Sequence, residues 1–73
     1  MEKNIFLIQL GTRIRKIRKQ KGMTQQHLSS VSEIEKANLS RIESGMTNPT
    51  VLTLLKICNA FDVKVTDLFT HSD

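Results

Sequence analysis

A short stretch between residues 35 and 44 combines side chains that donate hydrogen bonds with small side chains that permit close approach. Its sequence is EKANLSRIES. On a helical wheel Leu39 and Ile42 mark one side, and the opposite side carries Lys36, Ala37, Ser40, Arg41 and Ser44. An outward face of this kind offers donors for phosphate oxygens and for the N7 and O6 atoms of guanine. The alternative from this pattern alone is a polar solvent face on a small helical protein.

Residue types that support other chemistry are scarce. His27 and His71 have no cysteine or carboxylate partners at metal-ligand spacing, so we expect no metal site. A core of this size leaves little room for a catalytic cleft, so we expect no catalytic residues, enzyme activity, cofactor or small-molecule ligand. Cys58 lies in an apolar context, which favours a small core residue over a reactive thiol, and a single cysteine fits a reducing cytoplasm.

Length and charge narrow the class of protein. We expect residues 1–73 to form one domain near the lower size limit for a self-supporting core. No apolar run approaches the roughly 18 residues of a membrane span, and the start lacks a small-residue cleavage site, so a cytoplasmic protein without a membrane partner is expected. Residues 3–32 contain seven Lys or Arg and no Asp or Glu. Such a run is either a solvated helix face or an electrostatic footprint for a phosphate backbone.

The spacing of apolar residues predicts an all-α, compact bundle of five helices with no sheet. The first helix spans about Asn4 to Gln20, with an apolar stripe, and ends at Gly22; the stripe comprises Leu7, Leu10, Ile14 and Ile17. Thr24 caps a second helix over about 25–31, and a third covers about 35–44 before Gly45.

The last two predicted helices follow the loop MTNPT. Thr50 caps the fourth, whose wide apolar face comprises Val51, Leu54, Leu55, Ile57, Cys58 and Phe61. Thr66 caps a fifth of a turn or two, which holds Leu68 and Phe69. Helices two and three are separated by about four residues, the spacing by which a helix-turn-helix presents a recognition helix to the major groove of DNA.

Three segments together resemble the Cro/phage-repressor helix-turn-helix family, also called the xenobiotic-response-element family. They are LGTRIRKIRKQKGMTQQHLS, NLSRIESGMTNPT and LLKICNAFDVKVTDLF, in the family's order and spacing over about residues 10–69. The resemblance implies a lambda-repressor-like fold in which helices 2 and 3 form the helix-turn-helix. It also implies a transcriptional regulator that binds double-stranded operator DNA, usually as a homodimer; restriction-modification controllers, prophage repressors and antitoxins all fit this size.

The resemblance also implies roles for individual residues. Gln25 matches a glutamine that fixes a phosphate and braces the recognition helix. Lys36, Ala37 and Arg41 match base-facing positions, and Thr47 and Asn48 match a loop that contacts the DNA backbone. The complete set of candidate DNA-binding positions is Thr24, Gln25, Glu35, Lys36, Ala37, Asn38, Ser40, Arg41, Thr47 and Asn48.

Two acidic residues depart from the family pattern. Glu33 stands where the turn usually has glycine, and a left-handed backbone there would cost ~1 kcal/mol or more. Glu35 replaces the usual cap of helix three, while Ser32 and Glu35 have the spacing of a capping box, which would start that helix a turn early. Both acids would lie close to phosphates. They motivate an alternative, a protein-interaction or antitoxin-type module of the same fold with weak or no DNA binding.

Two further predictions concern assembly of the fold. Arg18 lies within about 20° of Leu7 on the wheel, inside the apolar stripe, so its charge requires a partner. Glu43 is the candidate, and the resemblance implies the same ion pair. Apolar residues near the end of the chain, Val65, Leu68 and Phe69, are candidates for a homodimer interface; the alternative is that they close the core of the monomer.

Overall fold

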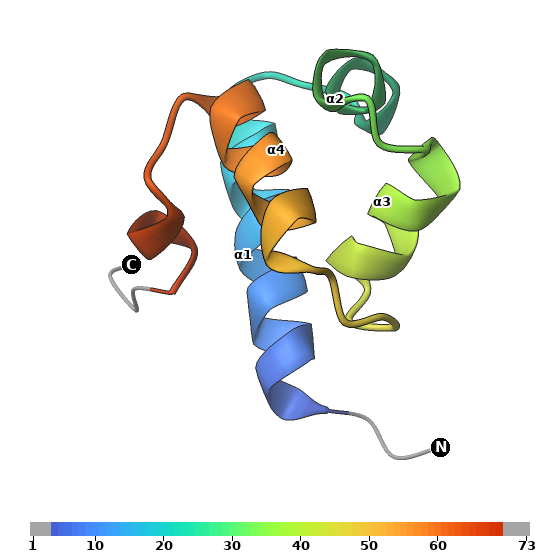
Figure 1. Ribbon diagram of the computed structural model, residues 1–73, viewed down its shortest axis with the longest axis vertical. Coiled ribbons are helices and arrows are strands. Elements are labelled where there is room, and N and C mark those ends of the chain that lie inside the picture. Colours follow the sequence, from blue (N-terminus) through green and yellow to red (C-terminus); the bar gives the residue numbers. More distant parts are fainter. Residues whose placement is uncertain (1–3, 70–73) are drawn as a thin grey trace.

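The computed structural model describes residues 4–69, which form four α-helices and a terminal 3-10 turn (Figure 1). The helices are α1 (Ile5–Gln20), α2 (Gln25–Ser32), α3 (Lys36–Glu43) and α4 (Val51–Phe61), and the turn is η1 (Val65–Leu68). These residues contain no strand, so the all-α prediction is confirmed. The prediction of five helices is wrong, because the fifth element is a 3-10 turn. His71 lies outside the described residues.

Side-chain caps define where the predicted helices start. Asn4 Oδ1 accepts a hydrogen bond from the Leu7 amide at 3.1 Å, and Thr24 Oγ1 accepts one from the His27 amide at 3.0 Å. Thr50 Oγ1 does the same for the Thr53 amide at 3.1 Å. Each bond satisfies one N–H group of a first helical turn that has no partner within the helix. The predicted caps Thr24 and Thr50 are confirmed.

Two other predicted caps, the Ser32–Glu35 capping box and Thr66, are wrong. Ser32 Oγ donates to the Leu28 carbonyl at 2.6 Å, so it does not cap α3, which begins at Lys36 with no side-chain cap from Glu35. Helix α3 therefore does not start a turn early. In η1, Asp67 Oδ2 accepts from the Lys64 amide at 2.9 Å, and the turn begins one residue before Thr66.

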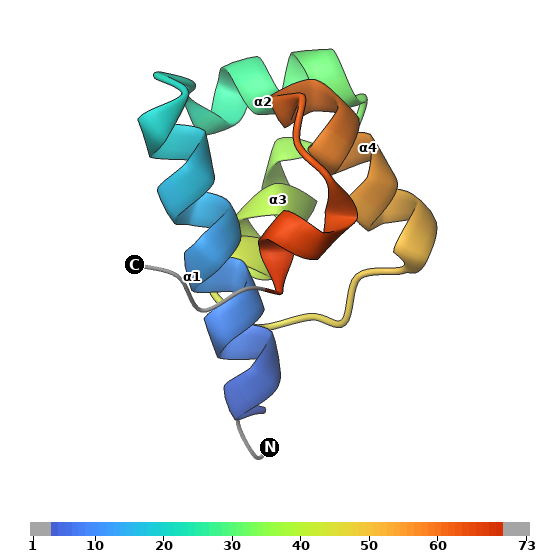
Figure 2. The same cartoon turned by 90° about the vertical axis from the view of Figure 1, so that its left-hand side faces the viewer.

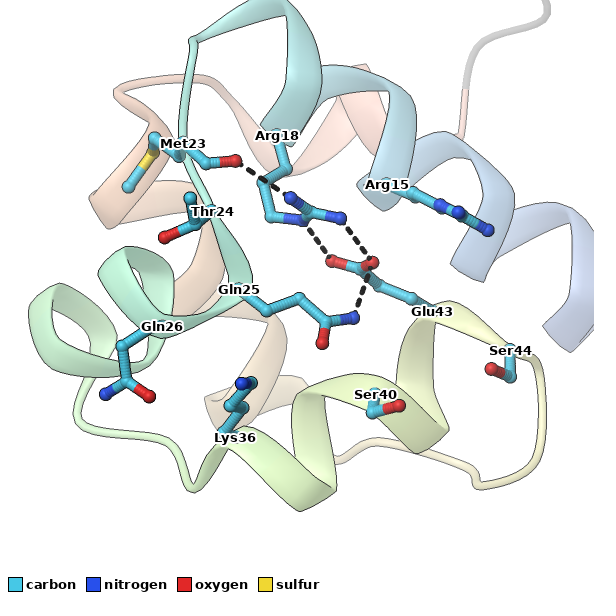
Figure 3. Close-up of a pocket in the computed structure, with 10 residues that line it drawn as sticks. All are labelled: Arg15, Arg18, Met23, Thr24, Gln25, Gln26, Lys36, Ser40, Glu43 and Ser44. Carbon is cyan, nitrogen blue, oxygen red and sulfur yellow. Dashed lines mark hydrogen bonds and ion pairs between the residues drawn. The ribbon is translucent and has the colours of Figure 1, made fainter.

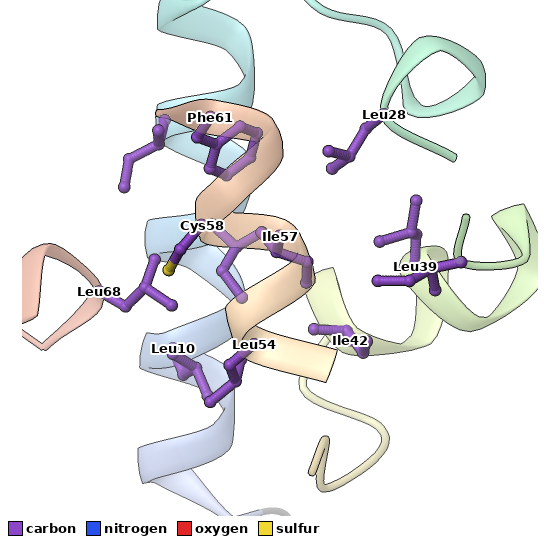
Figure 4. Close-up of a cluster of buried hydrophobic side chains, with 12 residues drawn as sticks. Leu10, Leu28, Leu39, Ile42, Leu54, Ile57, Cys58, Phe61 and Leu68 are labelled. Atoms are coloured by element: carbon purple, nitrogen blue, oxygen red, sulfur yellow. The ribbon is translucent and has the colours of Figure 1, made fainter. Parts of the chain in front are cut away.

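A single hydrophobic core holds the elements together (Figure 4). α1 packs on α3, α2 packs on α3 and α4, and η1 lies between α1 and α4, as Figure 2 shows. The core contains Leu10, Ile14, Ile17, Leu28, Ile34, Leu39, Ile42, Leu54, Ile57, Cys58, Phe61 and Leu68. Burial raises the pKa of the Cys58 thiol, and the negative charge of Asp67 raises it further. The interpretation of Cys58 as a core residue is confirmed.

The apolar faces are narrower than predicted. Leu7 is only half-buried at the start of α1, and Val51 and Leu55 of α4 are exposed. Leu68, in contrast, is 3% exposed and belongs to the monomer core, which corrects its assignment to a dimer interface. No helix among the described residues is long and apolar enough to cross a membrane.

Candidate nucleic-acid interface

A buried ion pair fixes α3 against α1 (Figure 3). Arg18 Nε donates to Glu43 Oε2 at 2.8 Å, and Arg18 Nη2 donates to Glu43 Oε1 at 3.1 Å. The two residues are 7% and 6% exposed. Arg18 Nη1 also donates to the Met23 carbonyl at 2.8 Å, which ties the pair to the segment before α2. The predicted pair is confirmed, and its two-bond geometry holds the end of α3 in one orientation.

Gln25 joins α2 to the same carboxylate. Its Nε2 donates to Glu43 Oε1 at 3.1 Å, so the bracing role that the family resemblance implies for Gln25 has a direct contact in the structure. One hydrogen of the amide group remains for another acceptor, since Nε2 carries two. Helices α1, α2 and α3 therefore meet at Glu43, and a shift of any one of them would strain the hydrogen bonds of the others.

The turn between α2 and α3 is short, and one of its residues, Glu33, has a left-handed backbone conformation. Glu33 has φ 60° and ψ 34°, the conformation that glycine adopts with least strain, so the expected cost of a non-glycine residue applies here. Ser29 Oγ donates to the Ile34 carbonyl at 2.6 Å, and the Ile34 side chain is buried in the core. These contacts hold the turn, while the Glu33 and Glu35 side chains remain exposed.

The predicted outward face of α3 is present. Lys36, Ala37, Ser40 and Arg41 are exposed, Asn38 is half-buried, and Leu39 and Ile42 point into the core. In the loop after α3, Thr47 is half-buried and Asn48 is exposed. The candidate positions on α3 thus lie together on one accessible helix, and those of the loop follow it in the chain.

A groove of about 530 Å³ runs between α1, the start of α2 and α3. Its lining includes the predicted residues Thr24, Gln25, Lys36 and Ser40. It also includes Arg15 of α1, which is exposed and was not among the predicted DNA-binding residues. Arg15 precedes Arg18 by nearly one helical turn, so it belongs to the polar face beside the buried arginine. The position of Arg15 beside Arg18 on the helical wheel is the sequence feature that could have identified Arg15 as a candidate.

Two contacts between side chains and backbone carbonyls were also not predicted from the sequence. Arg13 Nε donates to the Asp67 carbonyl at 3.2 Å, which links α1 to η1. The Met23 carbonyl contacts Arg18, and no sequence pattern indicated this bond. Within residues 4–69 no group of His, Cys, Asp and Glu side chains is placed to hold a metal ion.

Two short helices joined by a tight turn, the second exposing cationic and small side chains, define a helix-turn-helix protein. The comparisons with known proteins identify the family. Residues 14–68 match the model of the family HTH_3, described as helix-turn-helix, and the chain belongs to this family.

Relatives and solved structures agree with this assignment. The uncharacterized HTH-type transcriptional regulator y4dJ of Sinorhizobium fredii is 34% identical over 64 residues, which cover 88% of this chain and 83% of y4dJ. The HTH-type transcriptional regulator SlrR of Bacillus subtilis is 41% identical over 82% of this chain and 40% of SlrR. The restriction-modification controller protein C.AhdI of Aeromonas hydrophila superposes with a TM-score of 0.89 at 29% identity, covering 90% of this chain and 100% of C.AhdI.

Proposed function

We propose that this protein is a sequence-specific DNA-binding transcriptional regulator that inserts α3 into the major groove of duplex DNA. The observation that carries the proposal is the exposed α3 face formed by Lys36, Ala37, Ser40 and Arg41, on a helix whose orientation the buried Arg18–Glu43 pair fixes. An arginine can donate two hydrogen bonds to guanine O6 and N7, and small side chains allow the helix to approach the bases.

The names of the related proteins support this function. y4dJ and SlrR are HTH-type transcriptional regulators, and C.AhdI is a restriction-modification controller. C.AhdI is covered over its whole length, so a restriction-modification controller is one of the kinds of regulator that fit this proposal. The proposed DNA contacts are made by α3, by the start of α2 and by the loop that contains Thr47 and Asn48.

The operator that fits this proposal is an inverted repeat bound by a homodimer. One helix-turn-helix reads only a few base pairs, and a two-fold symmetric site requires a two-fold symmetric protein. The centres of the two half-sites should lie about one helical turn apart, so that both α3 helices reach the same side of the duplex.

The exposed acidic side chains of Glu33 and Glu35 favour a second candidate. Both belong to the turn that precedes α3, where negative charge opposes approach to phosphates. The alternative is therefore a protein-interaction or antitoxin-type module with weak or no DNA binding. The two candidates predict different behaviour with DNA, because phosphate contacts make duplex binding strongly dependent on salt concentration.

Selection of bound sequences from a random duplex pool tests the function. We expect an inverted repeat to be enriched, with each mismatched base pair weakening binding by ~1–3 kcal/mol in a fluorescence titration at physiological salt. Equal affinity for every duplex would remove sequence specificity from the proposal. Absence of any salt-dependent duplex binding would favour the interaction module.

A further inference from the structure

We infer that Glu35 selects cytosine at one position of each operator half-site, by accepting a hydrogen bond from the N4 amino group in the major groove. This inference rests on the proposed function and deepens it, because it assigns a base to one side chain. The family resemblance implies only a helix cap at this position, and Glu35 makes no side-chain cap.

The backbone of Glu35 is held on both sides. Its carbonyl oxygen accepts the first hydrogen bond of α3, from the Leu39 amide at 3.0 Å. The preceding residue, Ile34, is buried in the core, and its carbonyl accepts from Ser29 Oγ at 2.6 Å. A base contact from Glu35 therefore requires ordering of one side chain and no movement of the backbone, which keeps its entropic cost small.

The carboxylate of Glu35 has no partner within residues 4–69. It makes no hydrogen bond or ion pair there, and the residue is exposed. Glu35 also does not line the groove between α1, α2 and α3, whereas the next residue, Lys36, does. The fold thus leaves this carboxylate unused, directly before the helix whose first residues contact base edges in a helix-turn-helix.

A carboxylate distinguishes among the polar groups of duplex DNA. Its oxygens only accept hydrogen bonds, so Glu35 cannot bond to the phosphate oxygens, which are acceptors as well. In the major groove, guanine offers two acceptors, and thymine offers an acceptor and a methyl group. Adenine has a donor beside the acceptor N7, whereas cytosine has the N4 donor alone. Cytosine is therefore the base that fits Glu35 best.

The cationic side chains of α3 cannot take this role. Lys36 and Arg41 carry donors and no acceptor, so they suit guanine and not the amino group of cytosine. An acceptor at Glu35 lets the same helix distinguish a C·G pair from a G·C pair. The contact also offsets the repulsion between this carboxylate and the phosphates.

Selection of bound sequences from a random duplex pool compares the wild type with Glu35→Gln and the control Glu33→Gln. Both substitutions remove one negative charge from an exposed residue at nearly constant size. Glutamine pairs its amide with N6 and N7 of adenine, so Glu35→Gln should change the preferred base at one position per half-site from cytosine to adenine. Between two operators that differ only there, the affinity ratio should change by about tenfold or more.

The control separates base readout from charge. Glu33→Gln should bind all duplexes somewhat more tightly and select the wild-type motif, because it loses only repulsion from phosphates. A second variant, Glu35→Ala, should lose the preference for cytosine and gain no other, since alanine offers no hydrogen bond. Circular dichroism melting checks that all variants keep the wild-type fold.

The outcomes distinguish this inference from the proposed function. A wild-type protein that binds no duplex, or binds every duplex equally, contradicts the function itself. Sequence-specific wild-type binding with the same motif in Glu35→Gln and Glu35→Ala contradicts only the inference. An equal change of motif in Glu33→Gln, or a change from a base other than cytosine, also contradicts it.

Discussion

The carboxylate of Glu43, on α3, accepts hydrogen bonds from residues of two other helices. Arg18 of α1 donates two and Gln25 of α2 donates one, and all three distances are between 2.8 and 3.1 Å. Removal of one charge from such a pair leaves the other buried without compensation, which costs more than the intact pair contributes. Stability at this position therefore depends on the negative charge as well as on the shape of the side chain.

Glu43→Gln should lower the free energy of unfolding by ~3–5 kcal/mol, because Arg18 then has no negatively charged partner. In addition, the new amide N–H groups would face the N–H donors of Arg18 and Gln25. Denaturant unfolding measures this loss. Glu35→Gln is the matched control, since Glu35 is exposed and makes no side-chain cap; its effect should stay within about 0.5 kcal/mol. An unchanged midpoint in Glu43→Gln would contradict the argument.

Arg41 and Gln25 should affect DNA binding differently. Arg41→Ala should relax preference at one base position per half-site, at a cost of ~1–3 kcal/mol, because a guanine contact is lost. Gln25→Ala should weaken binding to all sequences evenly, because its proposed ligand is a phosphate and its bond to Glu43 braces α3. Selection experiments on both variants give the comparison, and identical changes in the selected motif would contradict this division.

Helices α1 and α3 approach each other so closely at Gly11 that only glycine fits there. A Cβ atom on Gly11 would lie 2.3 Å from the Ile42 carbonyl oxygen and 2.7 Å from that of Glu43. Both are backbone atoms, so a larger residue must separate the helices. Such a movement would also pull Arg18 away from Glu43.

Gly11→Ala should therefore destabilise the protein by ~1–3 kcal/mol or more through overpacking, and should weaken operator binding because α3 is displaced. Gly22→Ala is the control: φ is +70° there and no atom lies within 4 Å of an added Cβ, so its cost is limited to the left-handed conformation, ~1–2 kcal/mol. Thermal unfolding and operator titration of both variants provide the measurements. A Gly11→Ala variant with wild-type operator affinity would contradict the proposed displacement.

The features that were predictable from the sequence depend on neighbours in the chain. Thr24 and Thr50 cap helices through amides three residues away, and helical periodicity placed Arg18 among apolar residues. Ser32 was misread because two local partners were available, and the bond to the Leu28 carbonyl formed instead of a cap. The α1 wheel could not show that α2 and α3 pack beside Arg15, because that arrangement depends on how the helices cross.

Several large apolar side chains of residues 4–69 are exposed to solvent, and two groups of them stand out. Phe6 and Phe69 stack with ring centroids 6.0 Å apart, and they are 59% and 44% exposed. On α4, Val51, Leu52 and Leu55 are also exposed, with Leu52 at 71%. Exposed apolar clusters of this kind often mark protein interfaces, so both are candidates for the surface that joins the proposed homodimer.

The Phe6–Phe69 stack is the surface that we expect to form the dimer. Val65 packs against the core and Leu68 is inside it, so Phe69 is the remaining member of the predicted set with a largely accessible side chain. Phe69→Glu places a charge beside the Phe6 ring and should give a folded monomer with much weaker operator binding, since a two-fold site needs both subunits. Sedimentation equilibrium and circular dichroism provide the two readouts, with Leu52→Glu as the matched variant on α4.

An unfolded Phe69→Glu protein would place Phe69 in the monomer core. An unchanged dimer that Leu52→Glu dissociates would move the interface to α4, and a wild-type protein that stays monomeric at all concentrations would contradict the homodimer.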